Sequence, residues 1–281
     1  MSTDAAEPKP RRKWHLTKAL VLLIVATSAY AQWRAYTFNS ALKQAYALNW
    51  QVRNTKPVDL IYDDWKNAFK KDTWFDGVAS MEVPTGEELE QHRAMIQKLN
   101  PKDLTVGDCQ SLRDLSALKG HTQLKVLWIT SPSSLTNLDA LQNLTALERI
   151  KLDDAQALTN VDGLKNLLAV NSITLWDATK ITNLDALKNV PTLEDLDLRY
   201  CTALTNLDGL KNHKRLQTVH LVSCAALTNV EGLKNLPELK KVGIFGSTGL
   251  TKESIEALKA TLPRTIVYAM ESELVPKPPQ P

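Results

Sequence analysis

The chain repeats one pattern of hydrophobic and polar positions at a fixed interval of 23 residues. Six copies begin with a leucine or an isoleucine, at Leu112, Leu135, Leu158, Ile181, Leu204 and Leu227. The copies that start at residues 158 and 181 read LTNVDGLKNLLAVNSITLWDATK and ITNLDALKNVPTLEDLDLRYCTA, with no insertion between them. A fixed period in the twenties is typical of a solenoid, in which each copy forms one structural unit that stacks on the next.

The two halves of each unit predict different local structures. The second half follows the pattern L-x-x-L-x-L-x-x-small, as in Leu193, Leu196, Leu198 and Cys201. Its alternation of apolar positions predicts a β-strand. The first half, L-T-N-L-D-A/G-L-K-N, has its leucines three residues apart, which favours a tight or 3₁₀ turn over a long α-helix.

This combination resembles the leucine-rich repeat family, in the short bacterial form that also carries cysteine at the small position. The resemblance covers Leu89 to about Met270. It implies an α/β solenoid, a right-handed curved horseshoe with a parallel β-sheet on the concave face, short turns or 3₁₀ segments on the convex face, and a helical N-terminal cap. A unit of this length is too short for ankyrin or tetratricopeptide repeats.

Atypical segments frame the repeats, as expected for the ends of a solenoid. Thr85 and Glu88 form a capping-box pattern, which predicts a helix over residues 86–99. Residues 104–109 (LTVGDC) are in phase with the later strands and predict a degenerate first strand. Residues 252–262 predict a helix and residues 265–268 a last strand. We therefore expect an aromatic-rich cap at 32–88, repeats at 89–249, a capping unit at 250–270 and a proline-rich tail at 271–281.

Function in a repeat protein is expected where the repeated phrase varies. The strand residues between the leucines point away from the core onto the concave face. They mix aromatic, basic and acidic side chains, as protein-binding hot spots do. The candidate binding residues are Trp128, Arg149, Lys151, Asp153, Trp176, Asp197, Arg199, Tyr200, His220 and Phe245. The alternative is that the aromatic side chains at positions 128, 176 and 245 cover one another or pack under a loop.

Two columns of asparagine and three cysteines have structural interpretations. The asparagine columns, which begin at Asn137 and Asn143, recur in every later unit and are interpreted as groups that satisfy backbone atoms of the curved turns. A ligand-binding ladder is the alternative. Cys109, Cys201 and Cys224 share the small inward position. The strand spacing is compatible with a bond between the last two, but stacked parallel side chains rarely have the required torsion, so we predict free thiols.

The sequence carries no known catalytic motif, and we expect no enzymatic activity, no cofactor and no metal. P-loop, GxSxG and HExxH motifs do not occur. His220 is the histidine expected on the concave face, near Asp197 and Tyr200, without an evident nucleophile. An activity, if present, is expected in residues 32–88, because the repeats leave no cleft. The aspartates there lack calcium-loop spacing; they are Asp63, Asp64, Asp72 and Asp76.

Residues 1–31 have the layout of a targeting segment. Basic residues between Lys9 and Lys18 precede the apolar run ALVLLIVA at 19–26, and residues 29–31 read AYA. This order is typical of a secretory signal peptide cleaved before Gln32. The alternatives are an uncleaved anchor through residues 16–31, which is shorter than the roughly 20 apolar residues that span a bilayer, and a buried N-terminal helix. The first two place the body outside the cytoplasm, in the periplasm, in the cell envelope or secreted.

The formal charge of +3 arises in this same segment. Five of the 34 basic residues and two of the 31 acidic ones lie in residues 1–31, so the rest of the chain carries no net charge. A nucleic-acid partner is not expected, because its binding requires a clustered cationic surface. The sequence therefore predicts an exported, non-enzymatic module that binds a protein partner. The alternatives are a membrane-anchored envelope scaffold without a discrete ligand site and, third, an enzyme.

Overall fold

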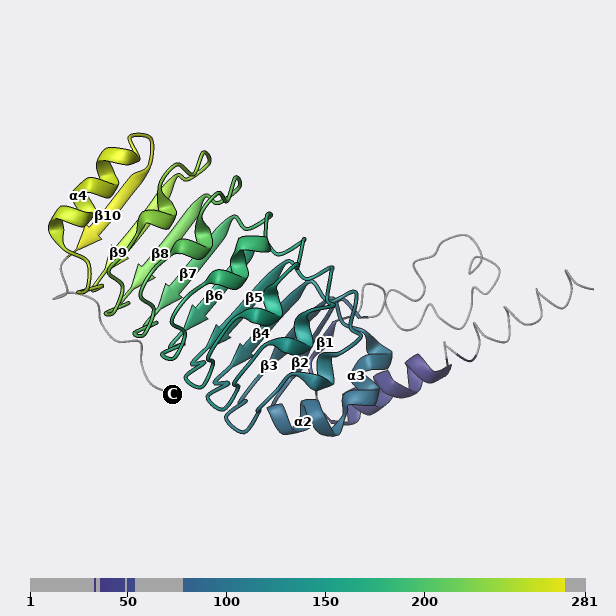
Figure 1. Ribbon diagram of the computed structural model, residues 1–281. Coiled ribbons are helices and arrows are strands. Elements are labelled where there is room, and N and C mark those ends of the chain that lie inside the picture. Colours follow the sequence, from purple (N-terminus) through teal and green to yellow (C-terminus); the bar gives the residue numbers. More distant parts are fainter. Residues whose placement is uncertain (1–32, 34–35, 49, 54–77, 271–281) are drawn as a thin grey trace, which may run out of the picture.

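The computed structural model describes residue 33 and residues 36–48, 50–53 and 78–270 (Figure 1). The expected targeting segment, the aspartates at 63, 64, 72 and 76, and the proline-rich tail lie outside these residues. Within them, no helix is both long enough and apolar enough to cross a membrane.

The described strands form a single sheet in which every strand lies beside its neighbours in sequence (Figure 1). β1 pairs with β2 in antiparallel fashion, and all later pairs are parallel. The strands are β1 (Val52–Arg53), β2 (Ser80–Val83), β3 (Asp103–Val106), β4 (Val126–Thr130), β5 (Arg149–Asp153), β6 (Ser172–Trp176), β7 (Asp195–Arg199), β8 (Thr218–Val222), β9 (Lys241–Phe245) and β10 (Ile266–Met270).

The sheet register follows the sequence period. From β2 to β9, paired residues are 23 positions apart, as in Met81 with Leu104 and Val219 with Val242. Each turn of the solenoid is therefore one sequence unit. The parallel sheet begins at β2, one unit before β3 and ahead of the expected start of the repeats at Leu89. Between β9 and β10 the interval changes to 25, as in Val242 with Val267, because the capping helix α4 replaces the usual turn.

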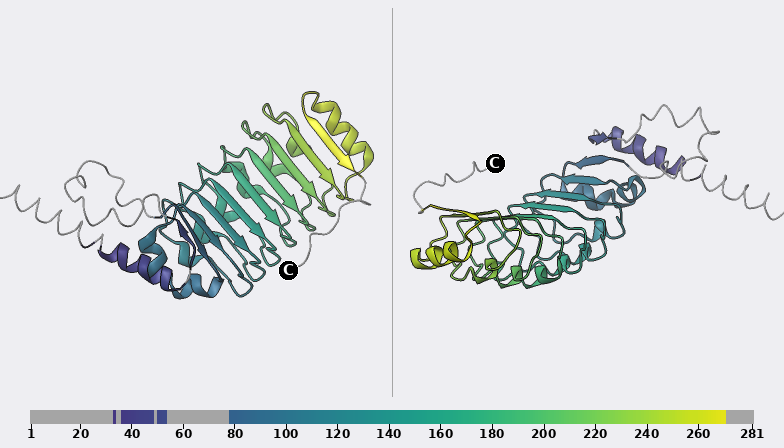
Figure 2. Two further views of the ribbon diagram at one scale, coloured as in Figure 1. Left: turned by 180° about the vertical axis from the view of Figure 1, so that it is seen from behind. Right: turned by 90° about the horizontal axis from the view of Figure 1, so that it is seen from above.

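The opposite face consists of 3₁₀ helices, as the three-residue spacing of the leucines predicted. Figure 2 shows the two layers from behind and from above, with the sheet lining the concave face of the curved solenoid. The 3₁₀ helices are η4 (Ser116–Leu118), η5 (Asp139–Leu141), η6 (Asp162–Leu164), η7 (Asp185–Asn189), η8 (Asp208–Leu210) and η9 (Glu231–Leu233).

The first asparagine column closes the turn that leads into each 3₁₀ helix. In five units its side-chain oxygen accepts a hydrogen bond of 2.7–3.2 Å from the backbone N–H two residues later, as in Asn183 to Asp185. This confirms the structural interpretation, because each side chain satisfies a backbone group of its own unit. The second column has a backbone role, since Asn166, Asn212 and Asn235 have positive φ angles of 59–68°.

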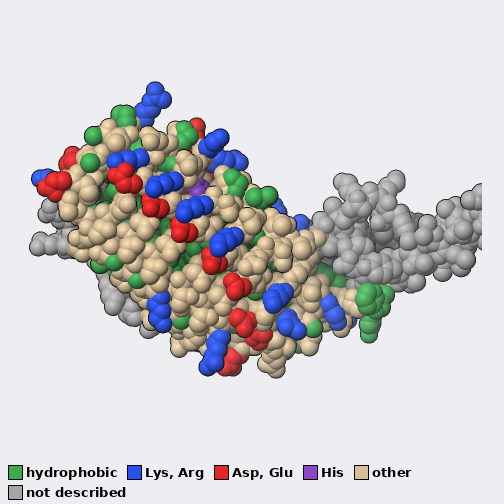
Figure 3. Space-filling model, in the orientation of Figure 1, with side chains coloured by type: hydrophobic (Ala, Val, Ile, Leu, Met, Phe, Trp, Pro, Cys, Tyr) green, Lys and Arg blue, Asp and Glu red, His purple; other side chains and the backbone are tan. Residues whose placement is uncertain are grey.

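A series of ion pairs lies on the same convex face. In each of four units, a lysine three residues after an acid reaches it at 2.6–2.9 Å; the pairs are Asp162–Lys165, Asp185–Lys188, Asp208–Lys211 and Glu231–Lys234. Figure 3 shows them as adjacent acidic and basic rows along the solenoid. Because most of these side chains are exposed, each pair contributes little to stability.

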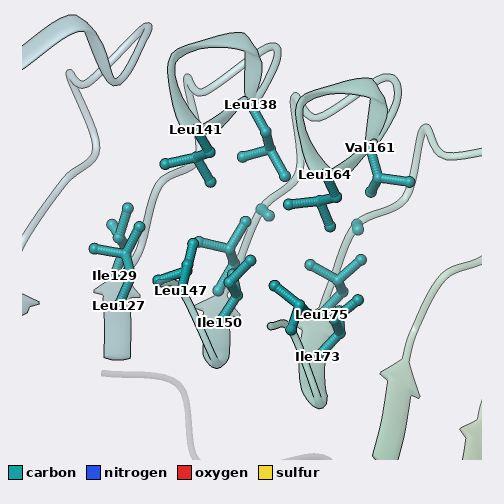
Figure 4. Close-up of a cluster of buried hydrophobic side chains, with 14 of the residues drawn as sticks. Leu127, Ile129, Leu138, Leu141, Leu147, Ile150, Val161, Leu164, Ile173 and Leu175 are labelled. Atoms are coloured by element: carbon teal, nitrogen blue, oxygen red, sulfur yellow. The ribbon is translucent and has the colours of Figure 1, made fainter. Parts of the chain in front are cut away.

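Leucine and isoleucine side chains from the two faces meet in one continuous core (Figure 4). In one unit, Leu138 and Leu141 from the turn pack towards Leu147, which precedes β5, and Ile150 of β5, and all four are at most 2% exposed. Burying such a side chain contributes about 1.5–3 kcal/mol. The repeated leucines are therefore the main source of stability.

The N-terminal end of this core is closed by helices. Residues 36–47 are helical and bury Ala41, Leu42 and Ala45. Helices α2 (Gly86–Gln91) and α3 (Arg93–Leu99) follow; the Thr85 side chain accepts a hydrogen bond from the Glu88 N–H, as the capping-box pattern predicted. The single helix expected over 86–99 is thus divided at residue 92.

The C-terminal end is closed by α4 (Lys252–Thr261) and β10. The Thr251 side chain caps α4 by accepting from the Ser254 N–H. Leu258 and Leu262 are buried, and Ile255 packs against the core from an intermediate position. The expected helix and strand are both present, and the strand extends two residues beyond position 268.

The three cysteines lie buried in the small inward column, and their thiols are free. Burial, reinforced by the nearby Asp108, raises the pKa of the Cys109 thiol to about 12. A thiol protonated at neutral pH is a poor nucleophile. This thiol therefore acts as a small core residue.

Candidate functional site

The register of the sheet places the varying residues in two central columns on the concave face. Leu127 and Ile129 of β4 are buried, so the alternating residues at 126, 128 and 130 point outward. The first column contains Trp128, Lys151, Thr174, Asp197, His220 and Gly243. The second contains Thr130, Asp153, Trp176, Arg199, Val222 and Phe245.

Two tryptophans and two cations alternate across strands β4 to β7. Lys151 Nζ lies 4.0 Å from the centroid of the Trp128 ring and 4.6 Å from that of Trp176. Arg199 Cζ lies 4.5 Å from the Trp176 centroid. Each distance is within the range of a cation–π interaction. We call these four residues the cation–π ladder.

Two aspartates hold the ladder in place. Asp153 accepts a hydrogen bond of 2.9 Å from Trp128 Nε1 and lies 3.1 Å from Lys151 Nζ. Asp197 accepts from both Nε and Nη2 of Arg199, at 3.0 and 2.9 Å. This two-point contact raises the pKa of the Arg199 guanidinium above its ordinary value. The cations are therefore fixed on one side and present the other to the rings.

The ladder remains accessible. Trp128 is 38% exposed, and the side chains of Lys151 and Arg199 are 31% and 39% exposed. Lys151 lies between the two indole rings, which it contacts on both sides. Phe245 belongs to a separate group, because a Cβ on Gly243 would lie 2.8 Å from the Phe245 ring and 3.2 Å from His220.

The structure brings together six of the ten candidate residues: Trp128, Lys151, Asp153, Trp176, Asp197 and Arg199. Tyr200 directly follows Arg199 in the chain. Arg149 is exposed at the start of β5, while His220 and Phe245 lie toward the C-terminal end of the face. The site is thus centred on β4–β7.

Tyr200 has an unfavourable backbone conformation. It occupies a column just after strands β4 to β9 in which every residue has a φ between +51° and +67°. The other members are small or short and polar: Ser131, Asp154, Asp177, Ser223 and Gly246. A bulky side chain in the left-handed region is strained. Such strain is concentrated at functional sites in proteins.

The pair of His220 and Asp197, considered for acid–base chemistry, lies on adjacent strands, and Arg199 engages the carboxylate. The two residues are opposite each other on β7 and β8, but both carboxylate oxygens of Asp197 accept hydrogen bonds from Arg199. In the part of the chain that the structure describes, no group of three histidine, cysteine or acidic residues is arranged to hold a metal.

Two residues of the capping unit, Ile266 and Tyr268, lie on the concave face and were not among the ten candidates. Ile266 pairs with Lys241 and Tyr268 with Gly243, which extends the concave face onto β10. Both side chains are 52% exposed. The 25-residue interval between β9 and β10 hides them from an alignment at fixed period. The alternation in TIVY was the available signal.

Two pockets among the described residues lie at the ends of the solenoid. One of about 400 Å³ is bordered by Ile244, Leu250 and Ile255 beside α4. The other, of about 390 Å³, lies between α2 and the loop after Cys109 and is bordered by Glu87 and Arg113. The ladder residues border neither of these two pockets.

Solved structures show which fold this is. The chain is 19% identical to the leucine-rich repeat domain of the type III effector XopL, with a TM-score of 0.52 over 85% of this chain and 93% of that one. It is 23% identical to internalin C2 from Listeria monocytogenes, with a TM-score of 0.50 over 70% of this chain and 82% of that one. No family model and no curated protein matches the sequence. The fold is a leucine-rich repeat solenoid, as the repeat pattern predicted.

Proposed function

We propose that this chain is an exported, non-enzymatic binding module whose concave sheet recognises a protein partner. Within the leucine-rich repeat fold, we place it with the short bacterial form. The observation that carries the binding proposal is the cation–π ladder, an accessible array of tryptophan, lysine and arginine on a rigid sheet. Tryptophan and arginine are enriched among the residues that dominate binding energy at protein interfaces.

The order of the ladder supports a role in binding. A free lysine or arginine loses rotamer freedom when a partner immobilises it, at a cost of about 0.5–1.5 kcal/mol per side chain. Asp153 and Asp197 already hold Lys151 and Arg199 in place. The strained Tyr200 beside them adds an aromatic side chain to this surface. Binding of a partner therefore costs little further side-chain conformational entropy at Lys151 and Arg199.

The open geometry favours a macromolecular partner over a substrate. The ladder extends across four strands, and the carboxylate of Asp197 is already engaged by Arg199. The best use of this surface is therefore contact with another protein.

Affinity measurements on matched variants test the proposal. The full-length chain is immobilised, partners are captured from extracts of its native source, and the captured protein is identified by mass spectrometry and purified. Its dissociation constant is then measured for the native chain, Trp176→Ala and Arg199→Ala. We expect each substitution to weaken binding by about 30-fold, since a hot-spot side chain contributes about 2 kcal/mol or more.

The matched control lies on the convex face. Lys188→Ala and Lys211→Ala each remove one cation from an exposed ion pair, and both are expected to leave the affinity unchanged. If the ladder variants bind as tightly as these controls while remaining folded by circular dichroism, the concave site is wrong.

A membrane-attached scaffold is the second candidate function. Trp33 and Tyr36 are 61% and 74% exposed on the N-terminal side of the solenoid, and they follow the apolar run at 19–26. Tryptophan and tyrosine are enriched at membrane–water interfaces. N-terminal sequencing of the native protein separates the candidates: a chain that starts at Gln32 is secreted, and one that retains residues 9–31 in the membrane fraction is anchored.

A further inference from the structure

The outer edge of β10 presents backbone groups that no described strand pairs with. The Ile266 N–H donates to the Lys240 carbonyl at 2.8 Å, so this residue points toward β9. Because successive residues of a strand alternate in direction, the N–H and C=O groups of Val267 and Ala269 point outward. Among the described residues, no strand pairs with this edge.

This edge lacks the features that usually protect exposed strands. Natural edges are shortened or carry charge or proline. β10 reads IVYAM, without charge or proline, and both Ile266 and Tyr268 are 52% exposed. At the other end of the sheet, β1 is only two residues long. The C-terminal edge is therefore the one suited to receive another strand.

The charges around β10 favour an identical strand in the antiparallel direction. Arg264 lies just before the strand, and Glu271 and Glu273 follow it in the sequence. When two copies of this segment pair antiparallel, the basic start of each lies beside the acidic end of the other. A parallel pair would place like charges together at both ends.

We propose that a second copy of this chain pairs with the outer edge of β10, antiparallel and about a twofold axis at Tyr268. In this register, Val267 of one copy and Ala269 of the other exchange their outward N–H···O bonds. The two Tyr268 residues face each other as a non-hydrogen-bonded pair, whose Cα atoms are about 4.5 Å apart. The interface is isologous, the usual form in a twofold dimer.

The pairing joins the sheets of two solenoids and turns both concave faces to the same side. This follows because a twofold axis between antiparallel edge strands stands perpendicular to the sheet. Two ladders then become available to one large or repetitive partner. A five-residue strand is small compared with the roughly 1,200–2,000 Å² of a stable interface, so the dimer forms in a concentration-dependent manner. The proposal does not depend on what the concave face binds.

Site-specific crosslinking in the full-length chain tests the pairing. Tyr268→Cys places two cysteines opposite each other, and their Cα separation falls within the disulfide range of about 4.4–6.8 Å. Mild oxidation should therefore yield a covalent dimer on a non-reducing gel. Thr174→Cys is the matched control, on the same column of the central strand β6. Cys109, Cys201 and Cys224 are buried. We expect at least tenfold more dimer from position 268.

A second substitution shows whether the strand edge causes the crosslink. Ala269→Pro, added to Tyr268→Cys, removes an outward N–H without a loss of β9–β10 hydrogen bonds, since proline is tolerated at an open edge. We expect the dimer yield to fall at least tenfold while circular dichroism is unchanged. The proposal is overturned if position 268 crosslinks no better than position 174. That result is expected if the tail or another protein covers the edge of β10. It is equally overturned if the proline leaves the crosslink intact.

Discussion

On the convex face, an acid and a lysine three residues later recur in four consecutive units, whereas on the concave face neither central column holds the same residue in two neighbouring units. The partners of the side chains differ in parallel. In the repeated turns, side chains bond to backbone groups of their own or the neighbouring unit, as Asn183 does with the Asp185 N–H and Thr159 with the Thr136 carbonyl. Concave side chains bond to other side chains, within a unit, as Arg199 does with Asp197, and between units, as Trp128 does with Asp153.

This difference explains why one face repeats and the other does not. Every unit supplies the same backbone groups, so the same asparagine or threonine can serve each copy of the turn. A contact between two side chains requires complementary residues, such as an indole N–H and a carboxylate, so neighbouring positions differ. The repeated face is therefore scaffold, and the irregular face contains the residues with specific side-chain partners.

The largest expected effect comes from crowding the convex stack. A Cβ on Gly163 would lie 1.8 Å from the Leu138 carbonyl oxygen, so Gly163→Ala forces neighbouring units apart. We expect a loss of about 3 kcal/mol in the free energy of unfolding, at the upper end for overpacking, measured by urea denaturation. Ala186→Gly, in the same column, should cost only about 1 kcal/mol. A loss below about 0.5 kcal/mol for Gly163→Ala would show that the units slide freely.

Acid should destabilise the scaffold through the buried His121. His121 occupies the column that Leu144 and Leu167 fill in later units, and its Nδ1 lies 3.0 Å from the Leu118 carbonyl. Burial lowers its pKa, so the folded state favours the neutral ring. The resulting stability is fully present above the unfolded pKa of about 6.5 and is lost as the pH falls through the folded value.

His121→Leu removes this titration. The decrease in melting temperature from pH 8 to pH 5 should therefore be smaller for the variant than for the native chain. Equal decreases in the two proteins would contradict a role for His121 in acid sensitivity.

A smaller effect is expected from one asparagine of the convex turns. Asn183→Ala removes the acceptor for the Asp185 N–H and the donor to Thr182 Oγ1. The expected loss is about 1 kcal/mol, as for a helix N-cap, measured by urea denaturation. Thr174→Ala on the concave face should change stability by no more than about 0.5 kcal/mol. Similar losses for the two variants would remove the distinction between the faces.

The smallest effect should have the opposite sign. Tyr200→Asn places a residue that tolerates positive φ where the native tyrosine is strained, so we expect a gain of about 0.5–1 kcal/mol. In a chain of this size the melting temperature rises by about 2 °C. The same variant should bind the partner more weakly. A destabilised variant would mean that Tyr200 is retained for packing.

Much of the fold and less of the site followed from the sequence. The three-residue spacing in LTNLDGLKN predicted the 3₁₀ helices, and the alternation in L-x-L predicted the strands, because both depend on neighbouring residues in the chain. The ladder was only partly predictable. The columns could be aligned, but the position of Lys151 between two rings depends on rotamers that the sequence pattern does not specify.

The sequence by itself determined the solenoid, its 23-residue period and its buried leucines. A strict period forces every unit into the same local structure. Only the tertiary structure decided which varying residues act together, since Trp176 and Arg199 meet across a strand boundary. It also decided that the concave face extends onto β10 with an open edge. The shift from a 23- to a 25-residue interval is set by how α4 packs, and packing between units is a property of the assembled chain.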